Sequence, residues 1–234
     1  MRAFPAGLRS LALDRPGYRA NPLGPGTFAG NVTWLLGELD QAGIDEAVLV
    51  GHSYGGGVAL AAAASAPERV RGLVLIASVG PGCVDGWDRL LAAPFVGPIC
   101  AVAAWGLTPW LVRLSLTAVA RRRDRPLEHH EHVLWDEWAN ARHENGAMWR
   151  TFLVEQRELV HRLDELDARL PQIATPTLVI ADPADRTVPV ATAYALSDQL
   201  PDARLRLISG GGHQLPRQIP DVIAAEIAQF AEQL

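Results

Sequence analysis

The sequence contains no lysine, so its 21 basic residues are all arginines, and they are spread along the chain. Against 26 acidic residues they leave a formal net charge of -5 at pH 7. A nucleic-acid-binding protein concentrates basic residues in a stripe or patch, which this distribution does not provide. The run RRRDR at Arg121–Arg125 is short and contains an aspartate, so we interpret it as a solvated turn. We therefore expect no nucleic-acid partner.

Long apolar runs are also missing from the sequence. A membrane-spanning helix needs about 20 consecutive apolar residues, and no uninterrupted run here approaches that length. The first ten residues, MRAFPAGLRS, lack the apolar region and the cleavage site of a secretory signal peptide. The sequence thus predicts a cytoplasmic protein without a membrane partner.

Cysteine is scarce, with Cys83 and Cys100 as its two occurrences. They form no CxxC pair, and no histidine stands at zinc-ligand spacing around them. We predict that both are buried free thiols.

What the sequence does contain is an alternation of apolar runs and helical patterns. The runs predicted to be strands are Ser10–Asp14, Ala47–Val50, Gly72–Ala77, Pro176–Ala181 and Arg204–Ile208. The segments predicted to be helices are Phe28–Gly43, Ser53–Ala66, Val190–Gln199 and Ile219–Leu234. Continuously apolar strands separated by helices are typical of a parallel sheet that is buried on both faces. The expected fold class is α/β, a mainly parallel sheet covered by helices on both faces.

Residues 83–172 differ in character because they contain no convincing strand. Leu90–Ala120 and Leu134–Leu166 have helical patterns, and six of the seven tryptophans fall between Trp87 and Trp149. A helical, aromatic-rich insertion between two strands is a plausible cap over a pocket, although the tryptophans could equally pack a small domain onto a large one. We predict a core of residues 1–82 and 173–234 and a cap of residues 83–172.

The stretch VLVGHSYGGGVAL runs from a strand into a helix through Ser53. Gly51 and Gly55 flank the serine at two residues on either side, and Gly56 follows. A serine at so sharp a turn has a strained backbone, and side chains at the glycine positions are expected to collide with it. The turn would project the hydroxyl beside a helix N-terminus, where backbone N–H groups favour a developing negative charge. This arrangement is a nucleophile elbow.

The elbow, the DRPGY sequence at Asp14–Tyr18 and two later loops together resemble the α/β-hydrolase superfamily, in its serine-nucleophile group with a helical cap. Members of that family carry the acid after a later strand and the histidine after the last one. The resemblance implies that Asp185, in ADPADRTVP, is the acid and that His213, in SGGGHQLP, is the base. Asp182 lies close enough to compete for the acid role, but it takes a position where relatives usually have glycine.

The resemblance also implies the chemistry. Ser53 would attack a carbonyl carbon while His213 takes its proton and Asp185 holds the imidazole. The backbone N–H of Tyr54 would donate to the oxyanion, and water would then cleave the acyl-serine. His52, next to the serine, is expected to point away and to be structural.

This chemistry requires neither a metal nor another cofactor. The histidines of EHHEH, Glu128–His132, could ligate a metal, but we interpret them as a charged helix start in the cap. The expected partner is a small-molecule substrate containing an ester, thioester, lactone or similar carbonyl group. Two alternatives stay open, namely a module that binds a small hydrophobic ligand and an acyltransferase.

The N-terminus departs from the family pattern. Relatives have two or three strands before the segment that matches Ser10–Asp14, and a His-Gly loop after the third strand supplies a second oxyanion donor. Both are absent from this sequence. We favour an internal methionine of a longer protein as the start, over a short chain that pairs Ser10–Asp14 directly with the next strand and over a catalytically silent member.

Overall fold

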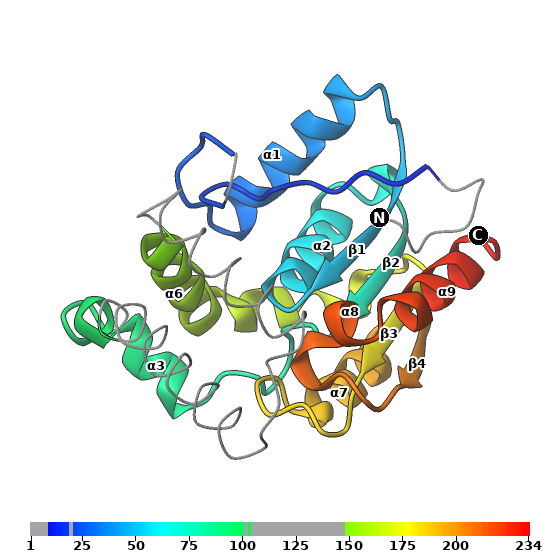
Figure 1. The fold of residues 1–234 in the computed structure, drawn as a ribbon. Helices are drawn as coiled ribbons and strands as arrows, with labels where there is room; N and C mark the ends of the chain where they lie inside the picture. The colour runs from blue at the N-terminus through cyan, green and yellow to red at the C-terminus, as the bar shows by residue number, and fades with distance from the viewer. Residues whose placement is uncertain (1–8, 19–20, 101–102, 104–147) are drawn as a thin grey trace, which may run out of the picture. The chain divides into compact units, whose positions relative to one another are not determined.

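The computed structural model describes residues 9–18, 21–100, 103 and 148–234 (Figure 1). The chain forms two compact units. The first comprises residues 1–13, 27–85 and 158–234, and the second comprises residues 14–26 and 86–157. The boundaries of 1–82 with 173–234 for the core and 83–172 for the cap stay a prediction.

Within the described residues, a parallel sheet of four strands forms the centre of the first unit. Its strands, in spatial order, are β1 (Ala47–His52), β2 (Val70–Ile76), β3 (Thr177–Ala181) and β4 (Ala203–Leu207). The register places Val50 opposite Val74, and Val74 opposite Leu178. Because all strands run in one direction, their carboxyl ends meet at one edge of the sheet, where sites of α/β proteins form. The predicted parallel α/β fold is confirmed.

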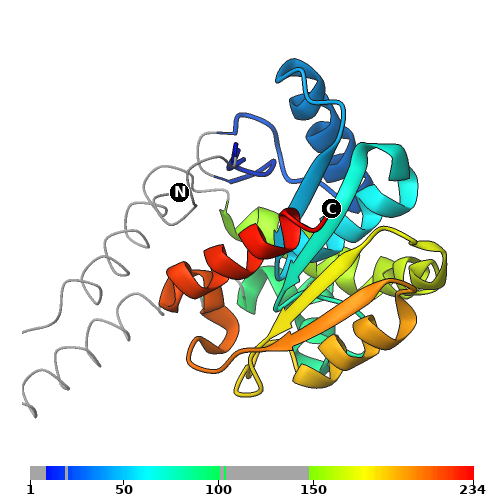
Figure 2. The ribbon, with the colours of Figure 1, turned by 90° about the vertical axis from the view of Figure 1, so that its right-hand side faces the viewer.

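Helices cover both faces of this sheet. They are α1 (Phe28–Gln41), α2 (Tyr54–Ser65), α7 (Val190–Gln199), α8 (Leu215–Gln218) and α9 (Pro220–Ala231), with short 3-10 turns at Pro67–Arg69, Leu170–Gln172 and Gly212–Gln214. Alternate residues of β2 enter different cores: Leu73 and Leu75 pack with α1, α2 and α7, whereas Val74 and Ile76 pack with α8 and α9. Figure 2 shows α9, in red, on one side of the strands and α2 and α7 on the other.

The ends of α1 illustrate how local sequence sets these elements. The Thr27 side chain accepts a hydrogen bond from the Gly30 N–H at 3.1 Å and so caps the first turn. Gly43 follows the helix with a φ of +64°, a conformation that favours glycine and ends the helix. The helix and the glycine stop agree with the sequence pattern.

The predicted strand at Ser10–Asp14 is wrong. The segment is irregular, and Leu11 is 54% exposed. A β-strand requires hydrogen bonds to a neighbouring strand. Within the described residues β1 is the edge strand of the sheet, and no further strand pairs with its free edge. The alternative in which Ser10–Asp14 pairs directly with β1 is therefore wrong as well.

The second unit contains α3 (Gly86–Ala92) and the first part of α6 (Met148–Asp167). The turn at Arg15–Tyr18 is fixed to α6, because Arg15 forms an ion pair with the buried Glu155 and the Tyr18 hydroxyl donates to Glu155 at 2.7 Å. The Thr151 hydroxyl adds a bond to the carbonyl of Gly17 at 3.0 Å. The DRPGY sequence thus has a structural role in this unit.

Several predictions for residues 83–172 concern parts outside the described residues. The helix predicted at Leu134–Leu166 is confirmed where α6 overlaps it. Most of Leu90–Ala120 lies outside, as do Arg121–Arg125 and Glu128–His132. Cys83 is buried and forms no disulfide, as predicted. Cys100 also forms no disulfide, but it is partly exposed, so the predicted burial is wrong for Cys100. Among the described helices, none combines the length and the apolar character required to cross a membrane.

Candidate active site

The turn between β1 and α2 holds Ser53 in a strained backbone conformation, with φ 54° and ψ -124°. A positive φ is uncommon for a residue with a side chain and persists where surrounding contacts enforce it. Here the Ser53 N–H donates to the carbonyl of Ile76 at 3.0 Å. The Ser53 carbonyl accepts from the N–H groups of Gly56 at 2.9 Å and Val79 at 3.3 Å. Bonds to the end of β2 and to the segment after it therefore stabilise the turn.

Two of the three predicted elbow glycines are required for space. A Cβ atom on Gly51 would lie 2.4 Å from the carbonyl oxygen of Gly55, and one on Gly56 would lie 2.0 Å from the Ser78 Oγ. A Cβ atom on Gly55 would meet nothing within 4 Å. The expected collision is therefore wrong for Gly55, which lies on the open side of the first turn of α2.

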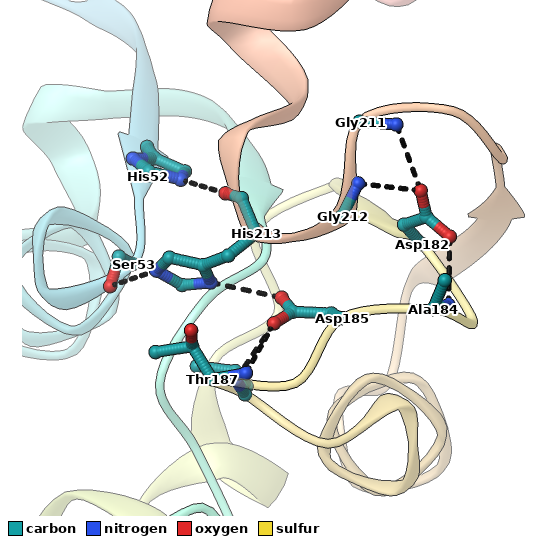
Figure 3. Close-up of polar contacts among 10 residues, drawn as sticks. His52, Ser53, Asp182, Ala184, Asp185, Thr187, Gly211, Gly212 and His213 are labelled. Atoms are coloured by element: carbon teal, nitrogen blue, oxygen red, sulfur yellow. Dashed lines mark hydrogen bonds and ion pairs between the residues drawn. The ribbon is translucent and has the colours of Figure 1, made fainter. Parts of the chain in front are cut away.

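The structure brings Ser53, His213 and Asp185 together (Figure 3). The His213 Nε2 lies 3.0 Å from the Ser53 Oγ, and its Nδ1 lies 2.9 Å from the Asp185 Oδ2. A carboxylate only accepts hydrogen bonds, so the Nδ1 carries the proton and the Nε2 is left to accept from the serine hydroxyl. The Asp185 side chain is 2% exposed and that of His213 15% exposed, so the histidine is the more accessible of the two.

The Asp185 carboxylate is oriented by its own loop. Its Oδ1 accepts the Thr187 N–H at 2.7 Å and the Val188 N–H at 3.0 Å, which leaves the Oδ2 directed at His213. Hydrogen bonds to an ionised acceptor are among the stronger ones in proteins. The loop after β3 thus fixes the partner of the imidazole.

Asp182, the alternative acid, binds a different group. Its Oδ2 accepts the backbone N–H groups of Gly210, Gly211 and Gly212, and its Oδ1 accepts the N–H of Ala184. The Ala184 bond, reinforced by those from the glycines, lowers the pKa of Asp182 despite the opposing effect of burial. Geometry therefore supports Asp185, rather than Asp182, as the partner of His213.

His52 does not point away from the site, contrary to expectation. Its Nε2–H donates to the backbone carbonyl of His213 at 2.7 Å, and the two rings have centroids 5.0 Å apart. Burial lowers the pKa of His52, which favours the neutral imidazole. The structural role of His52 stays a prediction. Its contact with the loop that carries His213 was missed because that contact joins segments far apart in the sequence.

The predicted oxyanion donor lies at the start of α2. Tyr54 is the first residue of α2, where backbone N–H groups have no acceptor within the helix. Its ring is buried and stacks on Phe28 with centroids 4.7 Å apart. The Tyr54 N–H as oxyanion donor, and the absence of a second donor, stay predictions. In the described residues, no cluster of three or more His, Cys, Asp or Glu side chains could hold a metal ion.

Comparison with known proteins decides the family. A family model described as "alpha/beta hydrolase fold" matches residues 1–216. The chain belongs to this family. Among its relatives, 2-hydroxymuconate semialdehyde hydrolase from Pseudomonas putida is 30% identical over 205 residues, which are 84% of this chain and 66% of the relative. The enzyme of the same name from Pseudomonas sp. strain CF600 is 32% identical over 78% of this chain and 60% of its own length. The chain thus spans less than two thirds of the length of each of these two hydrolases.

Solved structures share the fold of this member of the family. A thermophilic esterase from Thermogutta terrifontis superimposes with a TM-score of 0.70 at 21% identity, covering 94% of this chain and 78% of the esterase. A meta-cleavage product hydrolase from Pseudomonas fluorescens IP01 gives 0.67 at 21% identity, with 94% and 78% covered. At these identities the likeness concerns the fold alone.

Proposed function

We propose that this α/β-hydrolase family member is a serine hydrolase that cleaves a carbonyl-containing small molecule through an acyl-serine intermediate. The observation that carries the proposal is the continuous hydrogen-bonded chain from Asp185 through His213 to Ser53, with distances of 2.9 and 3.0 Å. Such a chain activates a hydroxyl that is otherwise a weak nucleophile at neutral pH.

In the first half of the reaction, the Ser53 Oγ attacks the carbonyl carbon and its proton passes to the His213 Nε2. Asp185 accepts the Nδ1–H throughout and stabilises the imidazolium. The developing oxyanion lies near the start of α2, where the Tyr54 N–H and the helix dipole favour negative charge. The leaving group receives the proton from the Nε2, and the acyl group stays on Ser53.

In the second half, His213 takes a proton from a water molecule, which attacks the acyl carbon. The bond from that carbon to the Ser53 Oγ then breaks, and His213 returns the proton to the serine oxygen as the acid leaves. These two reaction steps require an electrophilic carbonyl carbon, which esters, thioesters and lactones supply. The semialdehyde hydrolases among the relatives are compatible with a second candidate, a carbon–carbon bond next to a carbonyl. We place ester-type bonds first, because they need no chemistry beyond the triad.

The test is hydrolysis of 4-nitrophenyl acetate and butyrate by the wild-type chain, Ser53→Ala and His213→Ala. A matched control is Ser65→Ala, whose hydroxyl bonds to Ala61 at the far end of α2. We expect each triad variant to lose about 10³-fold or more in kcat and the control to keep the wild-type value. Equal rates for wild type and Ser53→Ala would contradict the proposal, and ligand-dependent thermal stabilisation without turnover would favour the ligand-binding alternative.

A further inference from the structure

Asp182 is a buried carboxylate with an unusual set of partners. The residue is 1% exposed, and it follows directly after β3. Its Oδ2 accepts three successive backbone N–H groups, from Gly210 and Gly211 at 2.9 Å each and from Gly212 at 2.7 Å. Its Oδ1 accepts the Ala184 N–H at 2.8 Å. Four donors therefore compensate the loss of hydration of one buried carboxylate.

The glycines are shaped to surround this oxygen. Gly210 and Gly212 have φ values of +111° and +51°, which a residue with a side chain rarely adopts. Successive N–H groups converge on one point when the backbone alternates in this way, forming a concave anion site known as a nest. A glycine-rich loop has many accessible backbone conformations. The hydrogen bonds to the Asp182 carboxylate restrict this loop to one of them.

Asp182 also contacts Asp185, the hydrogen-bond partner of His213. Its backbone carbonyl accepts the N–H of Asp185 at 3.0 Å, closing the turn that carries the acid. One residue thus holds the loop of Asp185 through its main chain. Its side chain holds the loop of His213, as Figure 3 shows for Gly211 and Gly212. The His213 carbonyl is held from the other side by His52.

We propose that Asp182 is a positioning residue, whose carboxylate fixes the backbone at Gly210–Gly212 and thereby holds the His213 imidazole between Ser53 and Asp185. The kinetic part of this inference rests on the proposed function. The structural part does not, because the order of the loop can be measured in a protein without activity.

The kinetic test compares second-order rates of fluorophosphonate labelling for the wild type, Asp182→Asn, His213→Ala and the double variant. Asp182→Asn keeps the side-chain volume but replaces one acceptor oxygen by an amide donor, which opposes the N–H groups it faces. We expect Asp182→Asn to slow labelling about 10- to 100-fold when His213 is present. In the His213→Ala background we expect a change of less than about twofold, because a residue that acts through His213 has no effect without it.

The control is Asp198→Asn, which removes an equal charge from an exposed position on α7. It should leave labelling at the wild-type rate. Equal losses from Asp182→Asn in both backgrounds would indicate a general structural role and overturn the proposal. A wild-type rate in Asp182→Asn would overturn it as well.

The structural test is amide hydrogen exchange at residues 210–212. We expect these N–H groups to exchange slowly in the wild type and in Asp198→Asn, and much faster in Asp182→Asn, while β4 stays protected. Unprotected exchange at residues 210–212 in the wild type would overturn the proposal even where a variant does not fold. A wild-type chain that is not labelled but shows this protection would contradict the proposed function and leave the positioning of the loop supported.

Discussion

At the scale of single residues, the glycines around Ser53 differ in what surrounds them. Gly51 faces the backbone of α2, and Gly56 faces the side chain of Ser78, two residues after the end of β2. Gly55 faces open space and lies in the first turn of a helix. Identical residues within six positions therefore have different reasons to be glycine, and substitution by alanine separates them.

Gly51→Ala and Gly56→Ala should each lower the free energy of unfolding by about 1–3 kcal/mol, because an added methyl group must displace packed atoms. Gly55→Ala should leave it unchanged or raise it by up to about 1 kcal/mol, because alanine is the better helix former. Urea unfolding of the three variants measures the difference. A Gly55→Ala protein as unstable as Gly56→Ala would contradict the assigned neighbours.

At the scale of elements, the end of α6 carries an ionisable group in an unfavourable place. Burial, with a smaller contribution from the nearby Asp164 carboxylate, raises the pKa of Asp167 to about 7. Its Oδ1 is buried and has no hydrogen-bond partner within the part of the chain that the structure describes. The folded protein therefore holds a proton on Asp167 at pH values where the unfolded chain has released it.

The raised pKa of Asp167 makes the stability of the fold depend on pH. Between about pH 4 and 7 the folded state binds more protons at Asp167 than the unfolded state, so this group's contribution to stability falls as pH rises. Asp167→Asn should therefore be more stable than wild type at pH 8 and about equal to it at pH 4.5. Thermal unfolding at the two pH values measures this. Asp164→Asn, at an exposed position, should give a smaller effect of the same sign, and a pH-independent difference for Asp167→Asn would contradict the shift.

The elements also show how far the sequence alone predicts this fold. The helices α1, α2 and α7 and all four strands of the sheet were predictable, because apolar periodicity and glycine or proline ends are local signals. Ser10–Asp14 has the apolar composition of a strand, but composition does not reveal whether a neighbouring strand is available.

The same limit applies to the site. Ser53, Asp185 and His213 could be selected because each stands in a distinctive loop after a strand. The contacts of His52 and Asp182 could not be predicted. His52 contacts a residue 161 positions away, and Asp182 contacts residues up to 30 positions away, so both depend on how neighbouring loops meet. The glycines before His213 indicated a shaped backbone, yet nothing local indicated that a carboxylate from another loop would occupy it.

At the scale of the whole molecule, the parallel sheet brings Ser53, Asp185 and His213 together. Ser53 follows β1, Asp185 follows β3 and His213 follows β4, so three loops from one sheet edge deliver side chains that are up to 160 residues apart. The register of the four strands therefore sets the distances in the triad. We expect this assembly to be catalytically competent in the chain of 234 residues.

The most direct test is intact mass spectrometry of the chain after exposure to a fluorophosphonate, beside Ser53→Ala. Because an activated serine is required for the reaction, we expect one adduct on the wild type and none on the variant. A folded wild-type chain without an adduct, or an adduct that persists in Ser53→Ala, would contradict the claim that Ser53, His213 and Asp185 form a working triad.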